Sequence, residues 1–355
     1  MGTKHLMDDM AAKGYGQPAA NQEEQPDELF IVKTANQWIN EAKVKPIPKK
    51  LFGEFWYQGE VCILFADTNV GKSILAVQIA NQISQGISFD PFHVEGVRSA
   101  VLYLDFELTD KQFEGRYSNE YKDHYQFDDL FIRVEIDPEA AIPEDVKFED
   151  HLMNQIEKLA EMYGAKVLII DNLTWLKNEL EKATAAAGLM KHLQALKKKH
   201  EISILVLAHT PKRDSTRPID ENDLQGSRIL LAFADSCFAI GKSNQEAGIR
   251  YLKQIKVRAV EKRFDHSSVI VCELAKSNGN FLEFRYLTTE AEYKHLKHPE
   301  QEKEEQETAK VLELRNAGKS FRQIGEELNI SHMKAKRMID KLDREGGDRA
   351  GDVPF

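Results

Sequence analysis

The sequence contains few cysteines, no long apolar run and no excess of positive charge. Only three of its 355 residues are cysteines, and Cys62, Cys237 and Cys272 lie far apart. Their spacing matches no metal site, so we expect buried free thiols in a reducing, cytoplasmic setting. No stretch approaches the roughly 18 consecutive apolar residues of a transmembrane helix, which predicts no membrane contact. The polar residues 1–28 hold no apolar core of a signal peptide.

The balance of charge is acidic. Lysine and arginine total 48 against 58 aspartates and glutamates, which gives a formal net charge of −10. This charge argues against a globally basic nucleic-acid binder but does not exclude a local basic surface, because phosphate contacts depend on where the cations lie. The length of 355 residues and a hydrophobic fraction of 42% allow one large globular domain and a small one.

Short β-rich runs alternate with helical patterns between residues 45 and 290. The first runs lack polar–apolar alternation, which is typical of strands buried on both faces, and the intervening helices predict an α/β fold with a parallel sheet. After residue 208, four better-alternating runs with short connections predict an antiparallel extension of this sheet. We expect strands at 61–66, 100–105, 130–135, 166–171 and 202–208 and helices at 72–85, 147–163 and 184–200.

The first of these strands runs into "ADTNVGKS", residues 66–73, which nearly matches the phosphate-loop motif G-x-x-x-x-G-K-[ST]. A strand before the loop and a helix after it give the arrangement in which backbone N–H groups and a helix N-terminus hold phosphates. We predict that the Lys72 ammonium reaches the β- and γ-phosphates of ATP and that the Ser73 hydroxyl holds Mg²⁺. The residues expected to bind the nucleotide are Asp67, Thr68, Asn69, Val70, Gly71, Lys72, Ser73 and Ile74.

Ala66 stands where the motif has its first glycine. If this position requires a positive φ, alanine costs about 1 kcal/mol. If Ala66 ends the strand with an ordinary φ, the cost is near zero. Because Gly71, Lys72 and Ser73 are intact, we expect the site to bind nucleotide.

Polar side chains end three further strands, at the edge where ligands bind in open α/β sheets. Asp171 ends "VLIID" and is predicted to associate with Mg²⁺, the alternative being a cap on the following helix. Asp105 and Glu107 end "VLYLDFEL", where alternation should send both to one face, and Glu107 is our candidate for the base that activates water. His209 ends "ILVLAH" and is the candidate that senses the γ-phosphate.

In this order, the motifs resemble those of the RecA-like ATPases and, more closely, of the hexameric helicases of the RepA and DnaB types. The resemblance covers about residues 45–290 and implies a RecA-like ATPase domain at 29–295, with these same roles for Glu107, Asp171 and His209. The segment "NDLQGSRILLAFADSCFAI" also matches the family pattern. Its matching residues are Gln225, Gly226, Ser227 and Asp235.

The resemblance also implies a catalytic contribution from a neighbouring subunit. In the family, a basic K-x-R element on a late strand acts on the γ-phosphate of the next subunit, and Lys256 and Arg258 in "QIKVRAVEKRF" are the best matches. Such cations stabilise charge that develops during phosphoryl transfer. The implied assembly is a homo-oligomer such as a hexamer, and the alternative is two solvated residues on an edge strand.

A long polar loop follows His209 and would face the central channel of a ring. In that position its cations would track the backbone of single-stranded DNA, although it offers no aromatic side chain for base stacking. The cations of this loop are Lys212, Arg213, Arg217 and Arg228.

Beyond a charged linker at 296–307, for which a helix start is the alternative, residues 308–345 predict three short helices. The first covers 308–316, Ser320 and Gln323 form a capping box for the second, and Ser331 caps the third. The segment resembles the helix-turn-helix of resolvases and sigma-type regulators, and the alternative is a small bundle for protein contacts. Its expected core is Val311, Leu312, Phe321, Ile324, Leu328, Ile330, Met338, Ile339 and Leu342. The third helix would present to duplex DNA the side chains of His332, Lys336, Arg337, Lys334 and Lys341.

Three functions are consistent with these patterns. The first is a DNA-directed ATPase, a RepA-like helicase or loader that serves replication or mobilisation of a plasmid or mobile element. The second is an ATP-switched DNA-binding regulator with little turnover, and the third is a recombinase-like filament former. Residues 1–28 and 346–355 are expected to be flexible tails.

Overall fold

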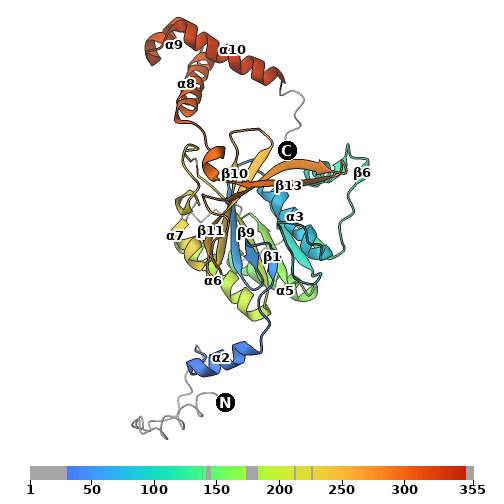
Figure 1. Ribbon diagram of the computed structural model, residues 1–355. Helices are drawn as coiled ribbons and strands as arrows, with labels where there is room; N and C mark the ends of the chain where they lie inside the picture. Colours follow the sequence, from blue (N-terminus) through green and yellow to red (C-terminus); the bar gives the residue numbers. More distant parts are fainter. Residues whose placement is uncertain are drawn as a thin grey trace, which may run out of the picture. The chain divides into compact units, whose positions relative to one another are not determined.

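The computed structural model describes residues 30–137, 139–140, 145–172, 183–211, 213–224 and 227–348 (Figure 1). The chain divides into two compact units, Met1–Pro48 and Lys49–Phe355. In the first unit, helix α2 spans Ala35–Lys43 and begins with a capping box of Thr34 and Gln37. The tail predicted at 1–28 lies outside the described residues.

The second unit is built around a nine-stranded sheet of order β13-β12-β11-β10-β3-β9-β8-β4-β7. Its β10-β3-β9-β8-β4-β7 part is parallel, and β11, β12 and β13 extend it antiparallel. The strands are β3 (Val61–Ala66), β4 (Val101–Asp105), β7 (Phe131–Val134), β8 (Val167–Asp171), β9 (Ser203–His209), β10 (Ser236–Lys242), β11 (Ile249–Val257), β12 (Val269–Ser277) and β13 (Phe281–Glu290). Two small hairpins, β1–β2 (Lys50–Phe52, Trp56–Tyr57) and β5–β6 (Ser118–Asn119, Asp123–His124), lie outside it. The predicted α/β fold with a parallel core and an antiparallel extension is confirmed.

One detail of that prediction is wrong. β10 was expected to belong to the antiparallel extension, but it pairs parallel with β3 and antiparallel only with β11. The cause is the short helix α7 (Ser227–Phe233) before β10, which returns the chain in the manner of a βαβ crossover. This helix was not recognised in the sequence.

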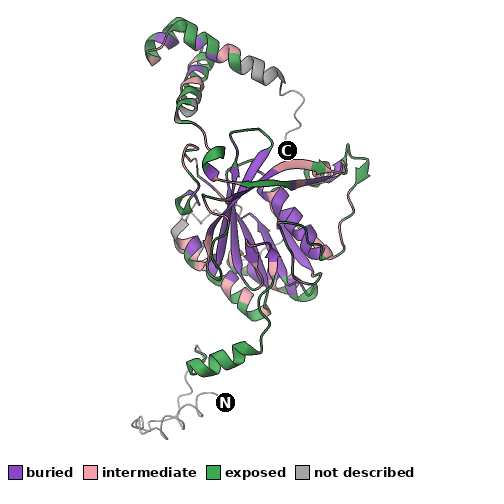
Figure 2. Cartoon of the chain, in the orientation of Figure 1, coloured by how far each residue is buried: buried purple, intermediate pink, exposed green. Residues whose placement is uncertain are grey.

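Helices pack on both faces of the sheet, and alternate residues of each central strand enter two separate cores (Figure 2). In β3, Ile63 joins a core that includes Ile156 and Leu193, whereas Leu64 joins one that includes Leu75. Each fully buried leucine or isoleucine stabilises the fold by about 1.5–3 kcal/mol. The helices that precede Pro299 in this unit are α3 (Lys72–Gln85), α4 (Asp110–Arg116), α5 (Phe148–Met162), α6 (Ala183–His200) and α7, with 3-10 turns at Glu221–Asp223 and Glu292–His295. The three cysteines are buried and free, as expected.

Three C-terminal helices share a small core of their own. They are α8 (Pro299–Asn316), α9 (Phe321–Leu328) and α10 (His332–Asp348). The predicted capping box of Ser320 and Gln323 begins α9, and the Ser331 hydroxyl accepts from the Lys334 N–H. The core contains Val311, Ile324, Met338 and the unpredicted Ala335, with Leu314, Phe321, Leu328, Ile330 and Ile339 packed against it.

One expectation about the core of this segment is wrong. Leu312 is 40% exposed and lies outside the core, because α8 turns it away from α9 and α10. Of the two interpretations of the charged run after residue 298, the structure agrees with the helix start, since α8 begins at Pro299. The side chain of Leu342 and residues 349–355 fall outside what is described. Within the described part of the chain, no helix is long and apolar enough to cross a membrane.

Candidate functional site

The phosphate loop connects β3 to α3, as the sequence predicts. Gly71 is the N-cap of α3 and has a φ of 110°, a conformation that L side chains rarely adopt. A Cβ at Gly71 would also lie only 3.0 Å from the Phe284 ring. The first N–H groups of α3, from Lys72 onward, have no intrahelical acceptor and are available to an anion.

Ala66 imposes no strain on this loop. It is the last residue of β3, is 2% exposed, and pairs in register with Ile240 on one side and His209 on the other. Its φ is not among the positive values of the described chain. The glycine of the motif is therefore dispensable here, because the position belongs to an ordinary strand.

The Lys72 ammonium lies at the carboxyl edge of β3. Its Nζ donates to the carbonyls of Ala66 and Asp67, at 3.1 Å each, and lies 3.2 Å from His209 Nδ1. Burial lowers the pKa of Lys72, and the carboxylates of Asp171 and Glu107 oppose that shift. The phosphate loop itself therefore holds the Lys72 side chain in place, through two of its carbonyls.

Asp171 is fully buried beside Lys72 and Ser73. Its Oδ2 accepts a hydrogen bond of 2.6 Å from the Tyr103 hydroxyl, whereas its Oδ1 has no hydrogen-bond partner. Burial raises the pKa of Asp171 to about 6, and the nearby hydroxyls of Ser73 and Tyr103 oppose that rise. A buried carboxylate oxygen without a partner, near a serine hydroxyl, fits a hard divalent cation that prefers oxygen ligands. Ser73 and Asp171 would hold Mg²⁺, which would supply charge neutralisation at the phosphates. The segment after Asn172, on which the alternative role of Asp171 as a helix cap depends, falls outside the described residues.

Glu107, Asn172 and His209 meet at the same edge. His209 Nε2 lies 3.5 Å from Glu107 Oε1 and 3.1 Å from Asn172 Nδ2, and the Asn172 amide donates to Glu107. Interaction with His209 lowers the pKa of Glu107 and outweighs the effect of burial. An ionised carboxylate at this place can accept a proton from water. Asn172 was not predicted from the sequence, although its position directly after the strand-end Asp171 is a signal that points to it.

Asp105 does not share this site. Its carboxylate accepts from Arg133 Nε at 2.9 Å and from the backbone N–H of Leu108 at 3.0 Å. The expectation that Asp105 and Glu107 point to one face is wrong, because β4 ends at Asp105 and the chain turns before Glu107.

A protein-family model described as AAA domain matches residues 26–215, more than half of the chain. The chain belongs to the AAA domain family. It is thus a P-loop ATPase with a RecA-like fold, in a family that binds ATP with Mg²⁺. Among solved structures it is similar to the KaiC-like protein PH0186 from the hyperthermophilic archaeon Pyrococcus horikoshii OT3, at 14% sequence identity. That likeness covers 64% of this chain and 90% of the other, with a TM-score of 0.42. No curated protein matches the chain.

Lys256 and Arg258 of this AAA domain protein lie near the amino ends of the parallel strands, whereas the phosphate loop lies at their carboxyl ends. Lys256 pairs with Cys237 at the start of β10, whereas the far end of β10 pairs with Ala66. Lys256 Nζ donates to the carbonyls of Leu231 and Ala234, and Lys256 lines a cleft of about 590 Å³. The Arg258 side chain is 56% exposed and pairs with Asp235 at 2.9 Å. Their predicted role on a neighbouring subunit stays a prediction.

The loop after His209 does not present all its cations freely. Arg217 pairs with Asp223 at 2.5 Å and with Asp220 at 3.2 Å, and Arg213 lies 3.6 Å from Asp223. These two arginines are therefore poor candidates for following a DNA backbone. Lys212, Gln225 and Gly226 fall outside the described residues, as do the side chains of Ser227 and Arg228.

The five residues predicted to bind duplex DNA divide into two sets on α10. All five are exposed, and His332, Lys336 and Arg337 form no ion pair with the described residues. Lys334 and Lys341 instead pair with Glu307 and Glu304 of α8, the second pair at 3.4 Å. The acidic first part of α8 therefore neutralises two of the predicted cations. The sequence of the third helix alone does not reveal this, because both glutamates belong to another helix.

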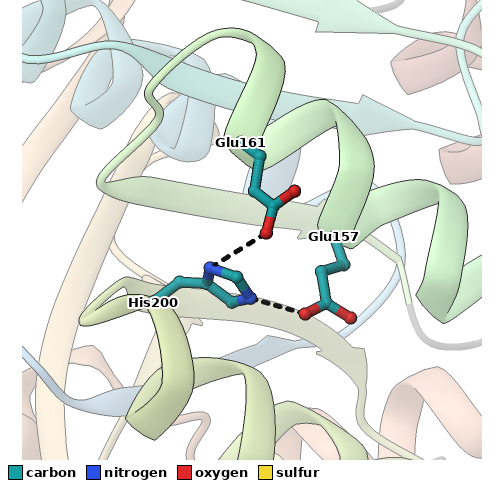
Figure 3. A group of neighbouring side chains, drawn as sticks. All are labelled: Glu157, Glu161 and His200. Carbon is teal, nitrogen blue, oxygen red and sulfur yellow. Dashed lines mark hydrogen bonds and ion pairs between the residues drawn. The ribbon is translucent and has the colours of Figure 1, made fainter.

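Elsewhere in the described residues, one further group of side chains could ligate a metal. His200, at the end of α6, lies between Glu157 and Glu161 of α5 (Figure 3). The imidazole is 2.5 Å from Glu157 through Nε2 and 3.8 Å from Glu161 through Nδ1. Lys199 Nζ also lies 2.5 Å from the same Glu157 oxygen. The Lys199 ammonium already neutralises the Glu157 carboxylate, whose negative charge would otherwise attract a metal cation. We therefore interpret this cluster as an ion-pair network between two helices.

Proposed function

We propose that this AAA domain protein is a DNA-associated ATPase of the RepA-like helicase or loader kind, in replication or mobilisation of a plasmid or mobile element. The observation that carries the proposal is the division of charged groups between two edges of one sheet. Lys72, Glu107 and His209 gather at the carboxyl edge, whereas Arg258 is exposed at the amino edge. A ring of identical subunits would bring the second edge of one copy to the first edge of the next.

The C-terminal helices supply the proposed contact with duplex DNA. α9 and α10 are joined by a short turn at residues 329–331, which is the form of a helix-turn-helix. His332, Lys336 and Arg337 are exposed on α10 and would meet phosphates or base edges. Lys334 and Lys341 would contribute only after their ion pairs with α8 open.

A regulator with little turnover is the second candidate. The observation that favours it is the neutralisation of Arg213 and Arg217 by Asp223, because each paired arginine leaves the channel loop one cation fewer for following single-stranded DNA. In this function, ATP binding would assemble the protein on duplex DNA and hydrolysis would be slow.

The rate of ATP hydrolysis with and without single-stranded and duplex DNA separates the two. A motor or loader predicts DNA-stimulated turnover that is lost in Lys72→Ala. Turnover that stays at background while duplex binding depends on ATP would favour the regulator.

A comparison of two arginine variants tests the contribution across subunits. Arg258→Ala should abolish hydrolysis while leaving ADP affinity near that of the wild type. Arg98→Ala is a matched control, since Arg98 is also 56% exposed and pairs with one aspartate, Asp128. Loss of ADP binding in Arg258→Ala, or equal loss of turnover in both variants, would argue against a role on the neighbouring subunit.

Duplex binding can be tested on α10 itself. Arg337→Glu should weaken duplex binding and reduce its salt dependence, because each lost phosphate contact lowers the slope by about one. Lys310→Glu, which makes the same charge change on the exposed surface of α8, is the control. Equal effects of the two variants would point to bulk charge rather than to α10.

A further inference from the structure

Arg250 is a buried cation for which no carboxylate compensates. It lies on β11, is 7% exposed, and no carboxylate of the described residues pairs with it. Its guanidinium donates only to backbone carbonyls, those of Val70 at 3.0 Å, Ala247 at 2.6 Å and Ile249 at 2.9 Å. Lys253, on the same strand and equally buried, instead pairs with Glu292. A buried charge without a counter-charge is costly, so the position of Arg250 calls for a reason other than stability.

The hydrogen bond from Arg250 to the Val70 carbonyl suggests a role in the phosphate loop. Val70 belongs to the phosphate loop, and its C=O shares one peptide unit with the N–H of Gly71. In a trans peptide the C=O and N–H point in opposite directions, so a donor that fixes the carbonyl from behind also aims the N–H away from itself. A charged donor also polarises the peptide and strengthens the N–H as a hydrogen-bond donor.

The antiparallel extension holds the loop at a second place. The Phe284 ring of β13 lies 3.0 Å from the position of a Cβ on Gly71. The backbone of Phe284 is fixed in turn by Gln78 of α3, which accepts from its N–H at 2.8 Å and donates to its C=O at 3.1 Å. The peptide between Val70 and Gly71 is thus braced by Arg250 on one strand and by Phe284 on another.

We propose that Arg250 is a positioning residue of the nucleotide site, which orients the Gly71 N–H toward the phosphates and places an uncompensated positive charge behind the loop. The anionic phosphates of a bound nucleoside diphosphate or triphosphate supply the negative charge that no described side chain provides. This inference rests on nucleotide binding by the ATPase and not on its proposed work on DNA.

Titration of the full-length protein with ADP tests the inference. Arg250→Met removes the charge and all three hydrogen bonds, and we expect it to weaken ADP binding about tenfold or more. Arg250→Lys keeps a point charge but cannot satisfy three carbonyls, so its affinity should lie between those of Arg250→Met and the wild type. The affinity of Arg250→Met should also respond less steeply to added salt, because one cation no longer acts on the phosphates.

A matched surface variant and a thermal melt separate positioning from simple stability. Arg285→Met is the control, since Arg285 lies on β13, is 60% exposed and pairs with Glu273. Its ADP affinity should equal that of the wild type. Wild-type ADP affinity in Arg250→Met, whatever its melting temperature, would overturn the inference.

If Arg250→Met does not fold, Arg250→Lys decides the question. A loss of about threefold in ADP affinity is then expected, and wild-type affinity would overturn the inference. Failure of the wild type itself to bind ADP, or unchanged binding in Lys72→Ala, would instead remove the nucleotide site on which the inference depends.

Discussion

Replacing Asp171 by asparagine should stabilise the protein in the absence of nucleotide and Mg²⁺. The carboxyl is fully buried, and burial raises its pKa from 3.8 to about 6. Because the folded state binds this proton more tightly than the unfolded state does, the charge costs stability progressively as pH rises from about 4 to about 6. Above pH 6 the full cost remains, and below pH 4 it is absent.

The size of the effect follows from the shift. A change of about two pKa units at about 1.4 kcal/mol per unit gives about 3 kcal/mol as an upper limit. For a unit as large as Lys49–Phe355, that corresponds to a rise in melting temperature of about 5 °C at pH 8. Tyr103 donates to Asp171 Oδ2 and can donate equally to the asparagine carbonyl, so the substitution retains that hydrogen bond.

Thermal melts of both proteins at pH 5 and pH 8, with a chelator present, measure the difference. The gain of Asp171→Asn should be clearly larger at pH 8, and adding Mg²⁺ and ATP should raise the wild-type melting temperature more than that of the variant. Asp129→Asn, at an exposed position, should shift the melting temperature little at either pH. A variant less stable than the wild type at pH 8, or a gain independent of pH, would refute the reasoning.

Two further substitutions test the phosphate loop and the strand-end cluster. Ala66→Gly should lower the free energy of unfolding by about 0.5–1 kcal/mol in a denaturant titration and leave ADP affinity unchanged, because Ala66 lies in a paired strand and has no positive φ. Tighter ADP binding by the variant would show that alanine strains the loop. Asn172→Ala should reduce ATP turnover about tenfold with little change in ADP affinity, because Glu107 loses the amide that orients it. Unchanged turnover at saturating ATP would show that Asn172 has no role in hydrolysis.

The sequence predicted those parts of the site that depend on local order. Apolar runs identified the central strands because both faces of the sheet are buried, and a polar residue at each strand end identified Asp171 and His209. The phosphate loop was found because its spacing is local and its helix begins directly after it.

The missed features depend on contacts between distant segments. Arg250 and Val70 are 180 residues apart in the chain, so no local pattern links them. Asp105 was misplaced because the alternation of a strand no longer holds once the chain turns. The arginines after His209 looked free because their partner, Asp223, reaches them only through the folded loop.

The Lys72 ammonium is solvated by its own loop, through the carbonyls of Ala66 and Asp67. A phosphate that binds Lys72 therefore replaces the carbonyls of Ala66 and Asp67 as hydrogen-bond acceptors of the ammonium. The free energy of binding is the difference between two sets of hydrogen bonds, and it is smaller than the new contacts alone would suggest. The carbonyls of Ala66 and Asp67 therefore compete with the phosphates for the ammonium of Lys72, and they set part of the affinity of the site.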